Sequence, residues 1–549
     1  MYPKKELAQT IIAACRIFEI QTVVISPGSR NAPLTIGFSN HEDFETLSIV
    51  DERCAAFFAL GIAQQKQKPV ALVCTSGSAL LNYYPAIAEA YYSQIPLVII
   101  SADRPSHLID IGDGQTIRQE NIFQNHILYS ANLKENDSDN NSLKLSKAFS
   151  LLHNVKGPIH INAPFDEPLY ETVKKMSDFS FKIEKPDTET NIDYNDLAQL
   201  WNSAAKKMIL VGVHYPNAAL EILLDKVADD PSVLVLTETT SNLNNKRFIN
   251  SIDNLIFNLT EEEFTSLKPD ILLTFGGMIV SKKIKKFLRD YSPKEHWHVN
   301  ELRAFDTYQV LSKHLKIDSH SFFKHFCELV DYDNKSTYES TWTHYKQRIR
   351  EKHNHYIKTA PYSDLKVFEQ VLKVIPDFSE VQFSNSAIIR YSQLFEMNST
   401  ITVFCNRGTS GIDGSTSTAL GAAYATQKPT TLITGDLSFF YDSNALWNNY
   451  IPTDVRIVII NNSGGGIFKI IPGPKKSTAL KYFETPHCLT AEHLCTMFGF
   501  EYSTAHNLKT LAEEIVGFYD KSDKPKVLEV FTPSDLNDLV LKEYINNLK

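Results

Sequence analysis

The sequence predicts an α/β fold made of three doubly wound parallel sheets. Short apolar runs rich in β-branched residues recur between stretches of helical periodicity, and this alternation is typical of parallel strands joined by right-handed crossovers. The apolar runs do not alternate with polar residues, as expected for strands buried on both faces. At 549 residues, the chain is too long for a single hydrophobic core. We therefore expect three domains, at residues 1–175, 190–332 and 363–549.

The first domain is expected to begin with an amphipathic helix at Lys4–Phe18. The alternation of strands and helices continues after this helix. Strands are predicted at Thr22–Ser26, Val70–Cys74, Leu97–Ser101 and Ile159–Asn162, and helices at Glu52–Gln64 and Ala79–Tyr92. Residues 176–190 are polar and contain proline, a composition that indicates a linker.

A second unit of strands and helices follows the linker. Its strands are expected at Met208–Val213, Ser232–Leu236, Ile271–Phe275 and His296–Asn300, and its helices at Asn217–Ala228 and Lys282–Leu288. This part has no GxGxxG sequence, so nothing supports a nicotinamide or flavin site. Residues 332–362 are charged and helical in parts, and we expect them to connect this unit to the third domain.

The third domain returns to the alternation of the first and has a comparable length. Its strands are expected at Val381–Ser384, Thr402–Cys405, Thr430–Thr434, Arg456–Ile460 and Lys526–Phe531. Its helices are expected at Ala387–Phe395, Ser415–Thr426, Ala491–Phe498 and Leu508–Phe518.

Composition excludes several classes of partner. The net charge of −9 argues against nucleic-acid binding. No apolar run is long enough to span a bilayer, and the start MYPKKELAQTI lacks the apolar core of a signal peptide. Seven cysteines without a CxxC pair, placed largely in apolar runs, indicate reduced and buried thiols. We therefore expect a cytoplasmic protein.

Two predicted strands of the third domain each end at a polar turn that contains glycine. Asp436 follows the strand at Thr430–Thr434, and Asn462 and Gly464 follow the strand at Arg456–Ile460. Because the carboxyl ends of parallel strands share one edge of a sheet, we expect Asp436 and Asn462 to meet in space. A carboxylate oxygen, an amide oxygen and a backbone carbonyl suit Mg²⁺, with Mn²⁺ as an alternative. The glycines would let a diphosphate approach the backbone.

Two other interpretations compete with this metal site. The same residues can form plain strand-end turns, with the aspartate capping a helix; the order Gly-Asp, helical stretch, buried strand and Asn-Asn favours the metal site instead. A literal Gly112-Asp113-Gly114 is also followed by Asn140-Asn141. We reject this second pair because residues 135–142 read as a surface loop with no apolar strand before it.

The segment Gly435–Phe468 resembles the diphosphate–magnesium motif of thiamine-diphosphate-dependent enzymes, which runs from Gly-Asp-Gly to Asn-Asn. Leu437 replaces the third residue of that motif. This departure is similar to one branch of the family, which decarboxylates 2-oxoglutarate and adds the succinyl carbanion equivalent to isochorismate in menaquinone biosynthesis. The resemblance implies a pyrimidine-binding first domain and a diphosphate-binding third domain. It also implies cofactor contacts from Gly435, Leu437, Ser438, Gly465, Ile467 and Phe468.

Glu52 is the catalytic residue that the resemblance implies. An acidic residue before the helix CAAFFALGIA is usually explained by the helix dipole. In the family, however, a carboxylic acid beside the aminopyrimidine ring exchanges a proton with the cofactor. We expect the apolar run behind Glu52 to disfavour its charged form. By the same resemblance, Ser76 and Gly77 face the pyrimidine end of the cofactor, and Ile412 holds the cofactor in its bent shape.

Basic and polar residues near predicted strand ends indicate which branch of the enzyme family the sequence resembles. A single arginine is usually a surface ion pair, but a set of planar guanidinium groups suits substrates with two carboxylates each. The resemblance implies that 2-oxoglutarate and isochorismate are bound by Arg30, Arg104, Gln115, Lys282, Lys283, Ser386, Arg390 and Arg407. Lys283 stands where some relatives carry arginine. Family active sites lie between two subunits, which implies a homodimer or a dimer of dimers.

Two further functions stay open at this point. Another thiamine-diphosphate-dependent 2-oxoacid decarboxylase or carboligase would share the metal segment and Glu52 but not the arginine set. A non-catalytic protein that retains the fold is the alternative from another class. An intact Glu52 beside an intact metal segment argues against the non-catalytic protein.

Overall fold

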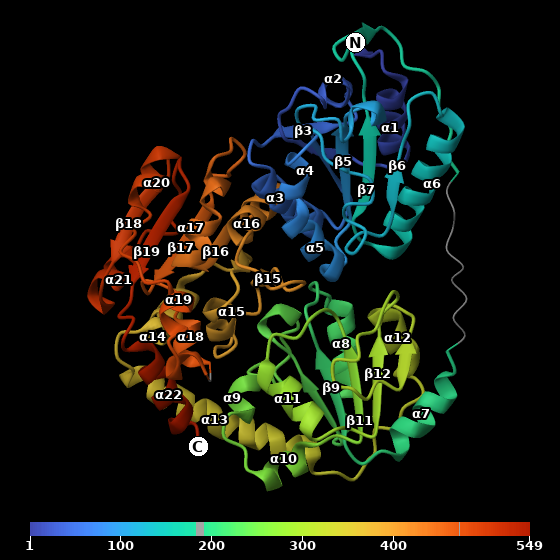
Figure 1. The fold of residues 1–549 in the computed structure, drawn as a ribbon. Helices are drawn as coiled ribbons and strands as arrows, with labels where there is room; N and C mark the ends of the chain where they lie inside the picture. The colour runs from blue at the N-terminus through green and yellow to red at the C-terminus, as the bar shows by residue number, and fades with distance from the viewer. Residues whose placement is uncertain (183–191, 472) are drawn as a thin grey trace.

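The structure is a computed structural model that describes residues 1–182, 192–471 and 473–549. The described part contains three parallel sheets of six, five and six strands (Figure 1), which confirms the predicted fold class. A short antiparallel pair joins β1 (Tyr2–Pro3) to β8 (Thr172–Val173). The domain boundaries stay predictions, and the predicted linker at 176–190 falls largely on residues 183–191, which lie outside the described residues.

The first sheet has the strand order β3-β2-β4-β5-β7-β6. Its strands are β2 (Thr22–Ile25), β3 (Glu45–Ser48), β4 (Val70–Cys74), β5 (Leu97–Asp103), β6 (Ser130–Asn132) and β7 (Ile159–Pro164). The helices of this part are α1 (Glu6–Ile17), α2 (Ala32–Ser39), α3 (Glu52–Lys66), α4 (Ala79–Asn82), α5 (Tyr84–Ser93) and α6 (Ser138–Val155), with the 3-10 helix η1 (Ser106–Leu108).

Two expectations for the first domain are wrong in detail. The predicted helix Ala79–Tyr92 is split into α4 and α5, because Pro85 in the first turn of α5 has no N–H to continue the bonding. The loop expected at 135–142 instead contains the start of α6, and β6 precedes it. Asn141 is buried in the first turn of α6, where its side chain bonds the backbone of Lys134. The polar residues that suggested a loop therefore begin a helix.

The central sheet has the order β10-β9-β11-β12-β13. Its strands are β9 (Lys207–Val211), β10 (Val233–Leu236), β11 (Ile271–Phe275), β12 (Glu295–Val299) and β13 (Lys313–Leu315). Its helices are α7 (Tyr194–Ser203), α8 (Ala218–Val227), α9 (Ile252–Ile256), α10 (Glu261–Leu267), α11 (Lys282–Asp290) and α12 (Ser319–Phe326), with the 3-10 helix η2 (Thr239–Ser241).

The third sheet has the order β15-β14-β16-β17-β19-β18. Its strands are β14 (Glu380–Phe383), β15 (Thr402–Cys405), β16 (Thr430–Gly435), β17 (Val455–Asn461), β18 (Glu501–Ala505) and β19 (Lys526–Phe531). Its helices are α14 (Asp364–Val374), α15 (Ala387–Ser392), α16 (Ser415–Thr426), α17 (Asp436–Tyr441), α18 (Ile467–Ile470), α19 (Leu480–Glu484), α20 (Glu492–Met497), α21 (Leu508–Ile515) and α22 (Asn537–Asn547), with the 3-10 helices η3 (Ser443–Leu446) and η4 (Pro474–Lys476).

One hydrophobic core joins the first and third sheets through α3 and α16. The backbones of these two helices touch: a Cβ on Gly61 would lie 2.1 Å from the carbonyl oxygen of Thr418, and one on Gly421 would lie 2.0 Å from that of Phe58. Every residue from Cys54 to Gln64 is buried. Side chains larger than hydrogen at the two glycines would push the helices apart.

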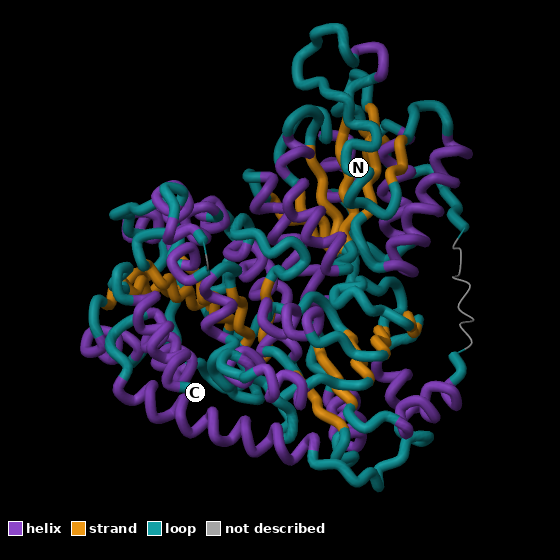
Figure 2. The backbone as a smooth tube through the Cα atoms, turned by 60° about the horizontal axis from the view of Figure 1, so that its bottom comes forward, coloured by secondary structure: helices purple, strands orange, loops and turns teal. Residues whose placement is uncertain are grey.

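The long helix α13 (Tyr338–Thr359) forms the connection predicted at 332–362. It runs along the edge of the molecule from the central to the third domain, as two views show (Figures 1 and 2). Tyr338 and Trp342 pack in the core of the central sheet, while Ile349, Tyr356 and Ile357 pack in the core of the third. Within the described parts of the chain, no helix combines the length and apolar character needed to cross a bilayer.

Candidate active site

The edge of the third sheet carries the residues predicted to hold a metal ion. β16 and β17 are parallel neighbours in which Gly435 pairs with Ile460, so both strands end at the same edge. Asp436 directly follows β16, and Asn462 and Gly464 follow β17. The N–H of Gly464 donates to Asp436 Oδ2 at 2.8 Å. The structure therefore brings the two strand ends together, as expected.

The oxygen atoms at this edge fit a hard divalent cation. Asn462 Oδ1 is buried and has no hydrogen-bond partner among the described residues. The amide is oriented by its Nδ2, which donates to Asp364 Oδ2 at 3.0 Å. Burial raises the pKa of Asp436 to about 6, a cost that a bound cation would offset. A buried carboxylate beside an unused amide oxygen is a suitable donor set for Mg²⁺ or Mn²⁺.

The glycine turn after β17 is covered, whereas the sequence suggested a turn open to a diphosphate. The N–H of Gly465 donates to the carbonyl oxygen of Glu484 at 2.7 Å. A Cβ on Gly464 would lie 2.4 Å from that same carbonyl oxygen, and His487 Nε2 lies 3.3 Å from Asp436 Oδ2. We call residues 480–487 the covering segment. A diphosphate reaches these N–H groups only when Glu484 and His487 move aside.

Ile467 and Phe468 lie directly beneath the covering segment. Ile467 begins α18 and is buried. The ring of Phe468 packs on Phe483, with ring centroids 5.2 Å apart, and Lys469 forms an ion pair with Glu484. These contacts hold α18 and α19 against each other.

The remaining predicted cofactor contacts surround Asp436. Gly435 precedes it as the last residue of β16, and the N–H of Leu437 donates to the Asp436 carboxylate at 2.7 Å. Ser438 Oγ donates to the carbonyl oxygen of Ile412 at 3.0 Å. This bond brings α17 against the glycine-rich turn before α16. The predicted cofactor contacts of α17 therefore lie beside Ile412, which is expected to hold the cofactor in its bent shape.

The first domain holds that glycine-rich turn through Glu89, a residue that the sequence analysis did not single out. Glu89 is buried in α5, and its carboxylate accepts from the N–H groups of Gly408 and Thr409, each at 2.7 Å. A Cβ on Gly408 would lie 2.6 Å from the Glu89 carbonyl oxygen. A single glutamate within the apolar sequence AIAEAY is the sequence feature that could have indicated this contact.

Arg30 and Arg104 lie together at the carboxyl ends of β2 and β5. Arg30 is 4% exposed, and its Nη1 donates to the carbonyl oxygen of Phe165 at 2.9 Å. Burial, and then the nearby charge of Arg104, lower the pKa of Arg30. The Nε atoms of both arginines are buried without a partner among the described residues. Two close guanidinium groups with unused donors fit an anionic ligand.

Ser76, Gly77 and Gln115 lie at the end of β4, the strand between β2 and β5. Ser76 Oγ is buried and has no hydrogen-bond partner among the described residues. Gly77 has φ +86°, and its N–H donates to Oε1 of the buried Gln119 at 2.9 Å. Gln115 is exposed, and its backbone lies 3.4 Å from where a Cβ on Gly77 would stand. Gln119, which also bonds Asn162, is a further residue that the sequence analysis missed.

A second group of basic residues lies between the central and third domains. Burial, and then the charge of Arg407, lower the pKa of Arg390, so these two guanidinium groups are close. Arg407 Nη1 donates to Asn385 Oδ1 at 2.7 Å, while the Nε atoms of both arginines are buried without a partner among the described residues. Glu238 and Asp253 of the central domain supply the opposing negative charge.

Lys282, Lys283 and Ser386 complete this second group. The two lysines are exposed in the first turn of α11, whose N-cap Ser281 bonds Asp253 through its hydroxyl. Lys283 also lies 5.8 Å from the ring centroid of Phe257. Ser386 begins α15 with a φ of +68°, a conformation that is costly for a residue with a Cβ and is often found at functional sites.

Comparison with known proteins identifies the family. Residues 5–129 match the family described as thiamine pyrophosphate enzyme, N-terminal TPP binding domain, and residues 189–381 match the middle domain of thiamine pyrophosphate enzymes. The proteins named 2-succinyl-5-enolpyruvyl-6-hydroxy-3-cyclohexene-1-carboxylate (SEPHCHC) synthase in Flavobacterium psychrophilum, Flavobacterium johnsoniae and Bacteroides thetaiotaomicron are 55%, 53% and 36% identical to this chain, and each match covers 100% of both chains. The chain belongs to the SEPHCHC synthase family. Thiamine pyrophosphate is the same compound as the thiamine diphosphate that the resemblance implied.

Glu52, the predicted catalytic residue of this SEPHCHC synthase family member, starts α3 at the surface of the single chain. It is only half-buried, and its Oε2 accepts from Asn82 Nδ2 at 3.0 Å. The helix is capped instead by Asp51, which accepts from the N–H of Cys54 at 3.1 Å. The apolar enclosure that we expected around the Glu52 carboxylate is therefore not provided by the isolated chain.

The predicted site residues of the SEPHCHC synthase family member fall into separate groups in one chain. Among the described residues, no hydrogen bond or ion pair joins Glu52, Arg30 or Arg104 to the metal edge or to Arg390 and Arg407. Asp51, beside Glu52, does contact η3, the 3-10 helix after α17: Asn444 Nδ2 donates to Asp51 at 2.8 Å.

Proposed function

We propose that the chain catalyses the SEPHCHC synthase reaction of menaquinone biosynthesis, in which 2-oxoglutarate is decarboxylated and the succinyl unit adds 1,4 to isochorismate. The observation that carries this proposal is the 53–55% identity, over the whole chain, to proteins named SEPHCHC synthase. The two groups of buried arginines support it, because both substrates are dicarboxylates and need several guanidinium partners.

Thiamine diphosphate, when bound, would supply a nucleophilic carbon and an electron sink for the decarboxylation. Asp436, Asn462 and Gly464 would hold the Mg²⁺ or Mn²⁺ ion that anchors its diphosphate. Glu52 would exchange a proton with the aminopyrimidine ring, and Ile412 would support the bent cofactor. This assignment is supported by the unused oxygen of Asn462 and the unused hydroxyl of Ser76.

The arginines would orient the two substrates and exclude molecules that lack a second carboxylate. Arg390 and Arg407, with Lys282, Lys283 and Ser386 nearby, would hold the carboxylates of one substrate, and Arg30, Arg104 and Gln115 those of the other. Planar guanidinium groups fix a carboxylate in two directions, which keeps the reacting carbons in line. A substrate without the second carboxylate would leave buried donors unpaired and would bind weakly.

A homodimer, or a dimer of dimers, is part of this proposal. Glu52 lies beside exposed apolar residues: Val50 is 42% exposed and Leu81 is 40% exposed. Tyr441, the last residue of α17, and Trp447, which follows η3, are 53% and 52% exposed. Such a patch favours contact with a second chain, and that contact would enclose Glu52. The seven unpaired cysteines support a cytoplasmic location.

Product analysis tests the proposed reaction. The full-length protein with thiamine diphosphate and Mg²⁺ is expected to convert 2-oxoglutarate and isochorismate into a product with the mass of SEPHCHC, with release of CO₂. Omission of isochorismate is expected to slow CO₂ release strongly. Full-rate CO₂ release without isochorismate, or no product of that mass, would contradict the proposal and favour another 2-oxoacid decarboxylase.

A further inference from the structure

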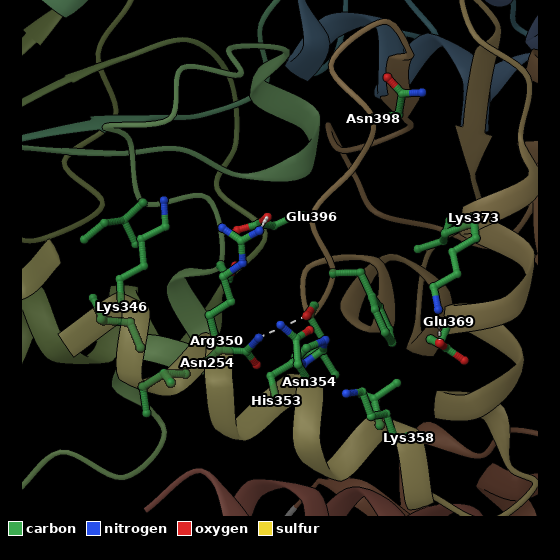
Figure 3. A pocket seen from close by; sticks show the side chains of 18 of the residues that line it. Asn254, Lys346, Arg350, His353, Asn354, Lys358, Glu369, Lys373, Glu396 and Asn398 are labelled. Atoms are coloured by element: carbon green, nitrogen blue, oxygen red, sulfur yellow. Dashed lines mark hydrogen bonds and ion pairs between the residues drawn. The ribbon is translucent and has the colours of Figure 1, made fainter. Parts of the chain in front are cut away.

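A cavity outside the candidate active site lies where the central domain, α13 and the third domain meet (Figure 3). It encloses about 490 Å³, and none of the residues predicted for the active site lines it. The central domain contributes the region of α9, the third domain contributes α14 and the segment after α15, and α13 supplies the wall between them.

The inner wall of this cavity is apolar. Leu255 comes from α9, Ile349 and Ile357 come from α13, and Leu394 and Phe395 follow α15. Each of these side chains is buried. The wall therefore suits a ligand with an apolar body rather than a bare inorganic ion.

The rim of the cavity is basic, although the chain as a whole is acidic. In Figure 3, Lys346 and Arg350 lie on one side of the cavity, and Lys358 and Lys373 lie on the other. Two of these cations are neutralised within the rim. Arg350 Nη2 lies 3.4 Å from Glu396 Oε2, and Lys373 forms an ion pair with a glutamate of α14.

The other two cations form no ion pair in the described part of the chain, although the charge of Glu396 favours the charged form of Lys346 from a greater distance. Among the described residues, neither Lys346 nor Lys358 has a carboxylate at ion-pair distance. Lys346 Nζ donates instead to the carbonyl oxygens of Phe248 and Lys246, at 2.6 and 3.3 Å. Burial lowers the pKa of Lys346, which means that its charge is poorly solvated. An anion in the cavity would relieve that cost.

His353 offers a ring nitrogen to the same cavity. Asn254 Nδ2 donates to the carbonyl oxygen of Leu394 at 3.0 Å, so Asn254 Oδ1 is the atom that accepts from the Tyr544 hydroxyl at 2.9 Å. The hydroxyl has then used its proton, and His353 Nδ1, 2.7 Å away, must be the donor in their contact. The other ring nitrogen of His353, Nε2, takes no part in these hydrogen bonds. Once protonated, it can donate to an anion.

We propose that this cavity is a binding site for a small organic anion with an apolar body, such as an aromatic or aliphatic carboxylate, sulfonate or phosphate ester. The charges of Lys346 on one side of the cavity and Lys358 on the other would attract the anionic group, and His353 lies between them along α13. The apolar body would lie against Ile349 and Phe395. This site does not depend on the proposed reaction.

Calorimetry with two matched probes tests the site. Naphthalene-2-sulfonate carries the anion on an apolar body, and naphthalene-2-sulfonamide has the same body without the charge. The probes are titrated into the full-length protein with excess thiamine diphosphate and Mg²⁺, so that the cofactor site is filled. We expect saturable binding of the sulfonate to one site per chain and at least about tenfold weaker binding of the sulfonamide.

Three lysine variants locate the binding site. Lys358→Gln changes an exposed side chain and should weaken sulfonate binding at least about threefold, and Lys346→Gln should weaken it further. Lys352→Gln makes the same charge change on α13 away from the cavity and should leave binding unchanged. No saturable binding of the sulfonate, or equal affinity in the wild type, Lys358→Gln and Lys346→Gln, would overturn the proposal.

The pH dependence of binding gives a second readout that does not involve either lysine. Burial lowers the pKa of His353 to about 4; Glu369 opposes this shift, whereas Arg350 and Lys373 reinforce it. A bound sulfonate would raise that pKa, so binding should tighten as the pH falls from about 8 to about 5. His353→Gln keeps a donor for Tyr544 and should remove this dependence. The same pH profile in His353→Gln and the wild type would contradict the role of Nε2.

Discussion

Glu238 is a buried charge that positions part of the candidate substrate site. Its carboxylate accepts from the N–H groups of Val280 and Ser281, both at 2.7 Å. These bonds fix the start of α11, which carries Lys282 and Lys283. The carboxylate also opposes the charge of Arg407. Because Glu238 acts through these groups, it is a positioning residue.

Replacement of Glu238 by glutamine is expected to raise KM for the dicarboxylate substrate that Arg390 and Arg407 would hold about three- to tenfold, with a smaller effect on kcat. Burial raises the pKa of Glu238 to about 7, so the carboxylate gains a proton as the pH falls through about 7. KM of the wild type should therefore rise between about pH 8 and about pH 6, whereas that of the variant should stay flat. Steady-state kinetics at several pH values measure both effects.

Glu262→Gln, an exposed change on α10, is the matched control and should behave as the wild type. If KM changed with pH in the same way in the wild type and in Glu238→Gln, Glu238 would not be a positioning residue of the substrate site.

The sequence predicted the members of the site that follow a strand directly, because register and parallel pairing place them at one edge. Asp436 and Asn462 are of this kind. It could not predict Asp364 or Glu89, which come from helices distant in sequence from the residues they bond. No local pattern marks such partners, since their role depends on how the sheets pack.

At the scale of elements, the strands buried in sheet centres were predicted within one or two residues, because long apolar runs define them. The edge strands β3, β6, β13 and β18 were missed, because each has a mixed or polar composition. The edge strands β10 and β15 are more apolar and were predicted. The helices α3 and α16 were each predicted, but not their pairing. Their close approach depends on Gly61 and Gly421 meeting backbone from the other domain, which a linear pattern does not reveal.

Gly421→Ala is expected to destabilise the protein by about 1–3 kcal/mol, because the new Cβ would overlap the carbonyl oxygen of Phe58. Thermal unfolding followed by fluorescence should show a lower Tm. Gly114→Ala serves as the control, because no atom lies within 4 Å of its Cβ position. Equal Tm values for Gly421→Ala and the wild type would mean that the helices can separate without cost.

The covering segment is expected to compete with the cofactor for the metal edge. His487→Ala removes the imidazole beside Asp436 and should tighten binding of thiamine diphosphate about threefold in the presence of Mg²⁺. Calorimetric titration measures this change, and chelation of the metal with EDTA should abolish the difference. His493→Ala, an exposed change on α20, should have no effect. Weaker binding by His487→Ala would indicate that the imidazole helps to hold the cofactor.

At the scale of the whole molecule, the separate groups of site residues predict that two chains share each active site. Glu52→Gln and Asp436→Ala chains should each be inactive alone. When mixed chains pair at random, half of the dimers contain one of each, and one of their two sites is intact. Activity should then return to about a quarter of the wild-type value. Assay of the unfractionated co-expressed chains measures this value, and the mixed dimer purified with two affinity tags should have about half of the wild-type activity. No recovery would place a complete site within one chain.

The burial of α3 under α16 has a consequence for synthesis. On the ribosome, the first sheet is complete long before the residues that cover α3 are made. Gly421 emerges about 360 residues after Gly61, a delay of roughly 20–70 s at ordinary translation rates. For that time, the face of α3 that α16 covers in the folded chain is exposed on the nascent protein, although the stretch from Cys54 to Gln64 is buried once folding is complete. Cellular yield should therefore depend on chaperones that shield apolar helices during translation.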